Sequence, residues 1–120
     1  MTTAGATARE HAEDYFRGWN AGDAEALRGL FDPQVSFRGP MGVADGPDEC
    51  VAGLLGMREG FLEEVVVEKL LVDGDEVVTW FEMRTRLDGV DPFPVVNRMH
   101  VGPDGIDRIR VVFDPRPLLG

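Results

Sequence analysis

Residues 15–23 read YFRGWNAGD, and they contain both the end of one predicted helix and the start of the next. The apolar side chains in and before this stretch share the i, i+3, i+4 and i+7 spacing of one helix face: Ala12, Tyr15, Phe16 and Trp19. Gly22 suits the left-handed residue that follows a helix, and Asp23 is a typical cap for the next one. The stretch therefore predicts two consecutive helices, the first of which buries an aromatic face.

The next elements are also predicted from apolar spacing and turn residues. The inner face of the second helix, which ends at Asp32-Pro33, is made of Leu27, Leu30 and Phe31. Residues 35–38 are predicted as a short strand. A third helix begins at residues 46–49, GPDE, because proline favours the first helical position and acids favour the first turn. Its apolar face is made of Cys50, Leu54, Met57 and Phe61.

Four β-branched runs fill the rest of the chain and are predicted as strands: residues 64–72, 76–87, 93–101 and 106–113. Turns that contain Asp-Gly pairs separate them, so the strands should form successive antiparallel hairpins. Helices first and strands second is typical of an α+β fold. We predict one domain over residues 1–120, a cone-shaped α+β barrel in which three N-terminal helices pack on a curved, mainly antiparallel sheet and enclose a cavity.

The composition is that of a small acidic protein. The 120 residues include 22 Asp and Glu against 12 Lys and Arg, which gives a formal net charge of −10. This charge disfavours nucleic acid and anionic membranes as partners, because neutralising phosphates requires clustered basic residues. All basic residues except Lys69 are arginine, which is typical of high-GC bacterial genomes. Residues 1–8 lack the basic and apolar regions of a secretory signal, so we predict a cytoplasmic protein.

Three of these segments resemble the nuclear transport factor 2-like superfamily: residues 15–23, residues 30–33 (LFDP) and the final strand with Asp114. Within it, the chain is most similar to the SnoaL-like and ketosteroid-isomerase-like branch, over about residues 8–118. The resemblance implies the same α+β fold with an internal cavity. The superfamily includes isomerases, aldol-type cyclases, epoxide hydrolases, dehydratases and non-catalytic binding proteins, so the cavity residues must indicate the function.

Similarity to ketosteroid isomerases implies a site that stabilises an enolate oxygen. The resemblance places Tyr15 at the position of the family's oxyanion tyrosine and Asn97 at its second hydrogen-bond donor. The position of the family's catalytic base falls on Gly39, which cannot take a proton. The amide of Asn97 can donate without a raised pKa. The resemblance therefore implies an oxyanion site that lacks the usual base.

The resemblance to SnoaL-like cyclases implies a different acid/base, the aspartate just after the last strand. Here Phe113-Asp114 and Leu118-Leu119 match that ending, so Asp114 is the candidate catalytic carboxylate. Strand alternation places Phe113 toward the cavity and Asp114 away from it, unless the strand bends. Asp114 is alternatively a turn cap or the partner of a nearby arginine. His100 also falls on the outer face by alternation, where a surface or interface role is favoured over catalysis.

The same alternation separates a predicted pocket wall from an outer face. The substrate-binding residues predicted from helix and strand spacing are Trp19, Leu54, Met57, Phe81, Met83, Thr85, Met99, Val111 and Phe113. The outer face carries mixed charges and one indole: Trp80, Glu82, Arg84, Arg86, Arg98, His100, Arg108 and Arg110. The density of arginine and the exposed tryptophan favour a homodimer that buries this face.

We expect a cofactor-independent isomerase or aldol-type cyclase that moves a proton on an apolar carbonyl compound, such as a polyketide or a steroid-like molecule. No metal site is predicted, since the acids of residues 73–76 form a hairpin tip. Residues 39–46 are glycine-rich but lack the lysine of a phosphate loop. The alternatives are a non-catalytic protein that binds a small ligand in the same cavity, and an interaction domain that works through the outer sheet face.

Overall fold

Helices supply one layer of the computed structural model, which describes residues 7–119. They are α1 (Ala8–Ala21), α2 (Ala24–Arg28) and α3 (Pro47–Gly60). Thr7 and Glu10 form a reciprocal capping box at the start of α1, and Gly22 ends this helix with φ 67°. The side chain of Asp23 accepts from the backbone N–H of Ala26 at the start of α2, as its sequence position predicts.

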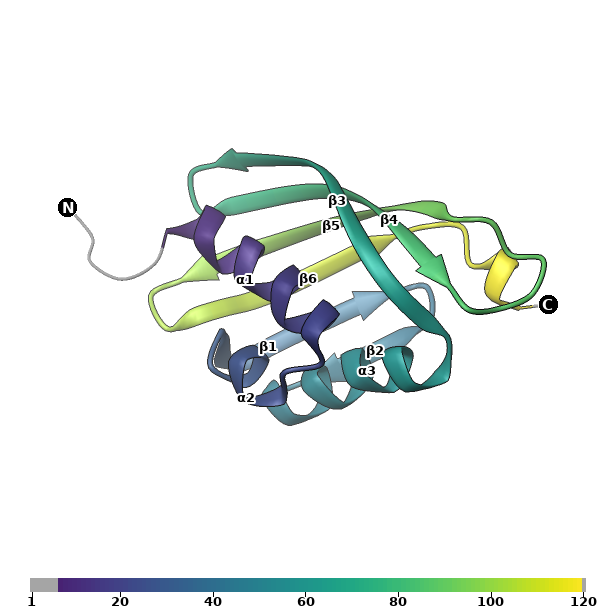
Figure 1. Ribbon diagram of the computed structural model, residues 1–120. Coiled ribbons are helices and arrows are strands. Elements are labelled where there is room, and N and C mark those ends of the chain that lie inside the picture. The colour runs from purple at the N-terminus through teal and green to yellow at the C-terminus, as the bar shows by residue number, and fades with distance from the viewer. Residues whose placement is uncertain (1–6, 120) are drawn as a thin grey trace.

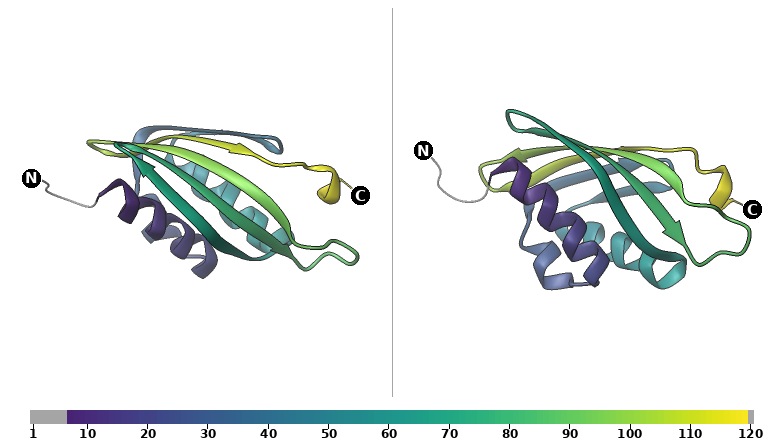
Figure 2. Two further views of the ribbon diagram at one scale, coloured as in Figure 1. Left: turned by 90° about the horizontal axis from the view of Figure 1, so that it is seen from above. Right: turned by 45° about the horizontal axis from the view of Figure 1, so that its top comes forward.

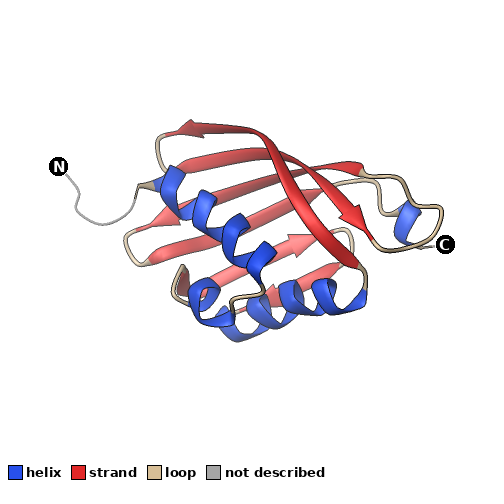
Figure 3. Ribbon diagram, viewed as in Figure 1, coloured by secondary structure: helices blue, strands red, loops and turns tan. Residues whose placement is uncertain are grey.

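The second layer is a curved, unclosed sheet of six strands in the order β2-β1-β6-β5-β4-β3 (Figures 1 and 3). The strands are β1 (Phe31–Gly39), β2 (Gly42–Asp45), β3 (Leu62–Asp73), β4 (Glu76–Thr85), β5 (Phe93–Gly102) and β6 (Gly105–Val112), and a short 3-10 helix, η1 (Arg116–Leu118), follows. Only the β1–β6 pair is parallel among these strands, so the sheet is mainly antiparallel. This arrangement confirms the predicted fold class.

The chain leaves α2 earlier than apolar spacing predicts. Leu30 and Phe31 do not lie on this helix, because β1 begins at Phe31 and pairs with β6. The backbone N–H of Ile106 donates to the carbonyl of Leu30 at 2.8 Å. Gly105, with φ 117°, permits this close approach, since a Cβ there would lie 2.6 Å from the Leu30 oxygen. Pairing with a distant strand therefore overrides the local helical pattern.

Helix α1 crosses the concave face of the sheet, while α3 runs below β1 and β2 (Figures 1 and 2). The side-chain amide of Asn20, at the end of α1, replaces a neighbouring strand at the free edge of β3. Its Nδ2 donates to the Val65 carbonyl at 2.8 Å, and its Oδ1 accepts from the Val65 N–H at 2.8 Å. These two bonds fix the end of α1 against the edge of the sheet, where it can position the aromatic face over the core.

The convex face of the sheet carries the predicted charged side chains, with two local differences. Arg86 lies beyond β4 and donates to the carbonyls of Leu62, Arg58 and Glu59, so it fastens the end of α3. His100 is half-buried, with Nδ1 2.6 Å from a carboxylate oxygen of Asp107.

No helix in residues 7–119 is long and apolar enough to cross a membrane. The prediction of a cytoplasmic protein rests on residues 1–8, and most of these residues lie outside the part of the chain that the structure describes.

Candidate functional site

A pocket of about 210 Å³ opens between the helices and the concave face of the sheet. Its helical wall consists of Tyr15, Trp19, Cys50, Gly53, Leu54 and Met57. Its sheet wall consists of Phe37, Phe81, Met83, Val95, Asn97 and Val111, with Phe113 just after β6. The mouth is formed by the β1–β2 hairpin, residues 39–44. Most of this lining is apolar, and none of the lining residues is Asp, Glu, His, Lys or Arg.

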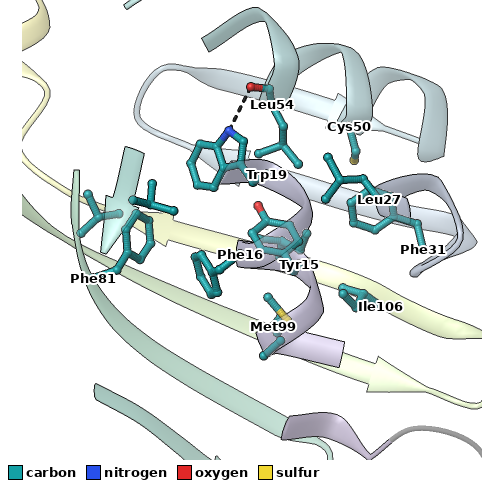
Figure 4. Close-up of a cluster of buried hydrophobic side chains, with 14 of the residues drawn as sticks. Tyr15, Phe16, Trp19, Leu27, Phe31, Cys50, Leu54, Phe81, Met99 and Ile106 are labelled. Atoms are coloured by element: carbon teal, nitrogen blue, oxygen red, sulfur yellow. Dashed lines mark hydrogen bonds between the residues drawn. The ribbon is translucent and has the colours of Figure 1, made fainter. Parts of the chain in front are cut away.

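Tyr15 brings a hydroxyl into this apolar pocket. The residue is fully buried on α1, and its hydroxyl points toward the side of the cluster where Leu54 and Cys50 lie (Figure 4). Burial raises the pKa of Tyr15 well above its ordinary value, the nearby Cys50 adds to this effect, and the Asn97 side chain offsets part of it. The hydroxyl is therefore neutral at physiological pH and can donate a hydrogen bond to a ligand.

Trp19 is held in place one helical turn after Tyr15. Its indole Nε1 donates to the Leu54 carbonyl at 3.0 Å, which ties α1 to α3 within the helical wall of the pocket (Figure 4). The ring centroids of Tyr15 and Trp19 lie 6.0 Å apart with an edge-on interplanar angle of 65°. The ring centroids of Trp19 and Phe81 also lie 6.0 Å apart. These contacts hold the aromatic rings that line the pocket in a fixed arrangement.

Cys50 lines the pocket from the first turns of α3. Burial raises the pKa of its thiol to about 11, the negative charges of Asp45 and Glu49 add to this rise, and Arg38 opposes it. A thiol with this pKa is neutral at physiological pH. Together with Tyr15, it gives the pocket two titratable groups, neither of which is charged near neutral pH.

Asn97 is the most polar residue of the sheet wall. It is 1% exposed, and neither its Nδ2 nor its Oδ1 has a hydrogen-bond partner among the described residues. The amide lies near enough to Tyr15 to favour that group's ionised form, although the two side chains make no aligned hydrogen bond. A buried amide with both ends unpaired is costly in a native core, so this residue marks the polar part of the pocket.

The structure brings most of the predicted site residues together. Tyr15 and Asn97 both line the pocket, as do seven of the predicted binding residues: Trp19, Leu54, Met57, Phe81, Met83, Val111 and Phe113. Met99 does not line it, and its side chain is fully buried in the hydrophobic core. Thr85 does not either, since it ends β4 and its Oγ1 accepts from the Leu87 N–H at 3.2 Å.

Asp114 lies outside the pocket. The strand β6 ends at Val112, and the exposed Asp114 carboxylate receives bonds from the Arg116 guanidinium at 2.9 and 2.7 Å. These bonds, with a further one from the Arg116 backbone N–H, hold the pKa of Asp114 below its ordinary value. This geometry matches the alternative interpretation, in which Asp114 pairs with an arginine. Asp114 is thus an ionised surface group, not a desolvated one.

The β1–β2 hairpin supplies the lining that sequence reasoning missed. Phe37, Pro40, Met41, Val43 and Ala44 line the pocket from this hairpin. Strand β2 has only four residues, and the burial along it does not alternate. A usable signal was the glycine-rich turn at residues 39–42, which can connect two short strands. In the described part of the chain, no group of three or more His, Cys, Asp or Glu residues could hold a metal ion.

Comparison with known proteins establishes the family. The family described as a SnoaL-like domain matches residues 12–114 of this chain. The chain belongs to the SnoaL-like family. No curated protein matches this SnoaL-like chain. Its fold is shared with proteins of several descriptions, so the family name alone does not specify a reaction.

Solved structures confirm the fold at low sequence identity. An NTF2-like protein of unknown function from Cytophaga hutchinsonii matches the SnoaL-like chain with a TM-score of 0.83 and 23% identity, covering 99% of this chain and 100% of the other. A candidate SnoaL-like polyketide cyclase from Jannaschia sp. CCS1 matches with a TM-score of 0.81 and 22% identity, covering 99% of this chain and 95% of the other. An LEH-like epoxide hydrolase from M. tuberculosis matches with a TM-score of 0.77 and 17% identity, covering 93% of this chain and 86% of the other.

Proposed function

We propose that this SnoaL-like protein binds a small, neutral, largely apolar carbonyl compound in the pocket between α1, α3 and the sheet. The observation that carries the proposal is an apolar cavity with hydrogen-bonding groups but no side chain that is ionised near neutral pH. The Tyr15 hydroxyl and the Asn97 amide can donate to a carbonyl oxygen. A charged ligand would lose its hydration without gaining a counter-ion, so the pocket favours an uncharged one.

The volume of the pocket limits the size of this ligand. This volume is about 210 Å³. Pockets for drug-sized ligands are larger, roughly 300–1,000 Å³. A single ring or a short branched chain fits this space, whereas a steroid or a fused polyketide would extend through the mouth. We therefore narrow the expected ligand to a small carbonyl compound.

A titration with ketones of increasing size tests this proposal. Single-ring ketones should bind measurably by calorimetry and shift the backbone amide NMR signals of Gly39 and Gly53, which line the pocket. The Tyr15→Phe variant should bind the same ketones about tenfold more weakly at most, because a neutral hydrogen bond contributes roughly 0.5–1.5 kcal/mol. If no ketone perturbs these signals, the proposal is wrong.

A second candidate function is an isomerase or aldol-type cyclase that acts by acid-base proton transfer without a cofactor. The shared location of Tyr15 and Asn97 favours it, since two donors at one carbonyl oxygen would stabilise an enolate. Asp114 would serve as the proton carrier after leaving Arg116 and turning toward the pocket, which the neighbouring Phe113 lines. In that case Asp114→Asn should reduce turnover by orders of magnitude with the fold intact. Unchanged turnover would remove Asp114 from the mechanism.

A further inference from the structure

Asn97 has hydrogen-bonding capacity that a simple ketone cannot satisfy. Its amide offers a carbonyl oxygen that needs a donor and an NH2 group that needs an acceptor, and both atoms are unpaired. A ketone oxygen can accept from Nδ2, but it has no hydrogen for Oδ1. A ligand with only a carbonyl would therefore leave the Asn97 oxygen buried without a partner, which is unfavourable.

The strands on either side of Asn97 do not supply the missing partners. In the sheet, Asn97 on β5 is paired with Thr79 on β4 and with Val111 on β6. Val111 is apolar, and the fully buried Thr79 has an Oγ1 that is itself unpaired. Thr79 does not line the pocket, whereas Asn97 does. The Tyr15 hydroxyl lies nearby on α1 but makes no aligned hydrogen bond with the amide. Both amide atoms of Asn97 are themselves buried, so a molecule in the pocket can pair with them only by packing directly against Asn97.

We infer that the ligand is a neutral ring that carries a hydrogen-bond donor directly beside its carbonyl, as a lactam does, and that it pairs with both ends of the Asn97 amide. This inference rests on the proposed binding function and specifies the ligand class of the same pocket. In a small lactam the N–H and C=O lie on the same edge, so the N–H donates to Oδ1 while the C=O accepts from Nδ2. The apolar part of the ring then lies against the aromatic wall formed by Trp19 and Phe81.

The uncharged lining of the pocket excludes two competing classes of ligand, carboxylates and ammonium ions. A carboxylate has two acceptor oxygens and would repel Oδ1 of Asn97, and no lining residue is basic. An ammonium ion has donors only, and no lining residue is acidic. The neutral thiol of Cys50 and the neutral hydroxyl of Tyr15 do not change this balance. A neutral donor and acceptor on one edge is the combination that satisfies the amide.

Two isosteric probes separate this inference from simple ketone binding. Caprolactam presents the N–H and C=O edge, whereas cycloheptanone has the same ring size and shape with the carbonyl alone. Calorimetric titration of the full chain should give at least about tenfold tighter binding of caprolactam, because cycloheptanone leaves the Asn97 oxygen without a donor. Caprolactam should also shift the side-chain amide NMR signal of Asn97. The ring of caprolactam is the more polar, so nonspecific apolar binding would give the opposite order.

Substitutions then assign the preference to one residue. Asn97→Leu keeps a similar volume but removes both polar atoms, so caprolactam should lose its advantage and cycloheptanone should bind at least as well. Thr79→Val is the matched control, since it removes an unpaired buried hydroxyl on the neighbouring strand that does not line the pocket. This control should keep the preference for caprolactam. Circular dichroism checks that both variants are folded.

The outcomes distinguish the two proposals. Equal binding of both probes to the unmodified chain, or tighter binding of cycloheptanone, overturns the inference and leaves the binding function standing. A caprolactam preference that survives in Asn97→Leu also overturns it, because another group must then supply the contacts. Binding of neither probe removes both the inference and the proposed function. The comparison on the unmodified chain decides the question even if Asn97→Leu does not fold.

Discussion

At the scale of single residues, the two unpaired amide atoms of Asn97 lower the free energy of unfolding, because they are buried in an apolar pocket. Replacing Asn97 by leucine removes two unpaired buried atoms at nearly constant volume, so we expect a more stable protein. The gain should be about 1–3 kcal/mol, the cost of leaving a buried polar group unsatisfied. Urea unfolding of Asn97→Leu and the parent chain measures it. A lower free energy of unfolding in the variant would mean that the amide is already well bonded in the free protein.

Cys50 provides a pH-dependent prediction at the same scale. Its pKa in the folded chain, about 11, lies above the ordinary 9.0. The folded state therefore favours the protonated thiol, and this contribution to stability is present below pH 9.0 and lost as pH rises through about 11. We expect slow alkylation of Cys50 at neutral pH, with a rate that rises toward pH 11. Rapid alkylation at neutral pH in the folded protein would contradict this pKa.

At the scale of elements, the bond between α1 and the edge strand β3 depends on one side chain. Asn20→Ala would leave the N–H and C=O of Val65 without their partners. We expect the free energy of unfolding to fall by about 2 kcal/mol or more, since each orphaned backbone group costs about 1–3 kcal/mol unless water replaces the bond. Thermal unfolding and amide hydrogen exchange at Val65 measure the effect.

Glu13→Ala on the same helix is the matched control for this prediction, because Glu13 is exposed and makes no hydrogen bond with the described residues. This control should change the free energy of unfolding by less than about 0.5 kcal/mol, as is usual for surface positions. An Asn20→Ala variant as stable as the control would show that the contact of α1 with β3 is held by apolar packing alone.

At the scale of the whole molecule, the convex face of the sheet presents an apolar row among charged side chains. Strand pairing aligns Trp80, Val96 and Val112 across β4, β5 and β6, and Trp80 and Val112 are 47% and 69% exposed. Arg98 and Arg110 are paired in the next row of this face, and Arg98 shares the carboxylate of Glu76 with Arg108. An apolar centre with an arginine-rich rim resembles a protein interface. We propose that two copies of the chain pair through this face.

Light scattering coupled to gel filtration tests this dimer. The unmodified chain should elute with twice the mass of 13.2 kDa, and Trp80→Arg should shift it to the monomer mass because it places a charge at the centre of the face. Leu87→Arg adds the same charge to an exposed position in the β4–β5 connection and should leave the dimer intact. A monomer for the unmodified chain at high micromolar concentration would overturn the proposal.

The regular elements were predictable because their signals are local. Helical spacing around Tyr15 and the N-terminal signals at Pro47 depend on neighbours within a few residues, and both helices form as predicted. Alternation along β4 and β5 correctly placed Phe81 and Asn97 on the concave face. The resemblance added the candidate pair Tyr15 and Asn97, which the fold brings to one pocket.

The sequence by itself determined the helices, the meander and the inward face, because each follows from the periodicity of nearby side chains. Tertiary structure decided the end of α2, since the start of β1 depends on its pairing with β6 more than 60 residues away. It also decided the position of Asp114, where the strand ends before the residue and Arg116 pairs with it. The unpaired state of Asn97 was likewise decided there, because an amide is satisfied or left free only by what packs around it.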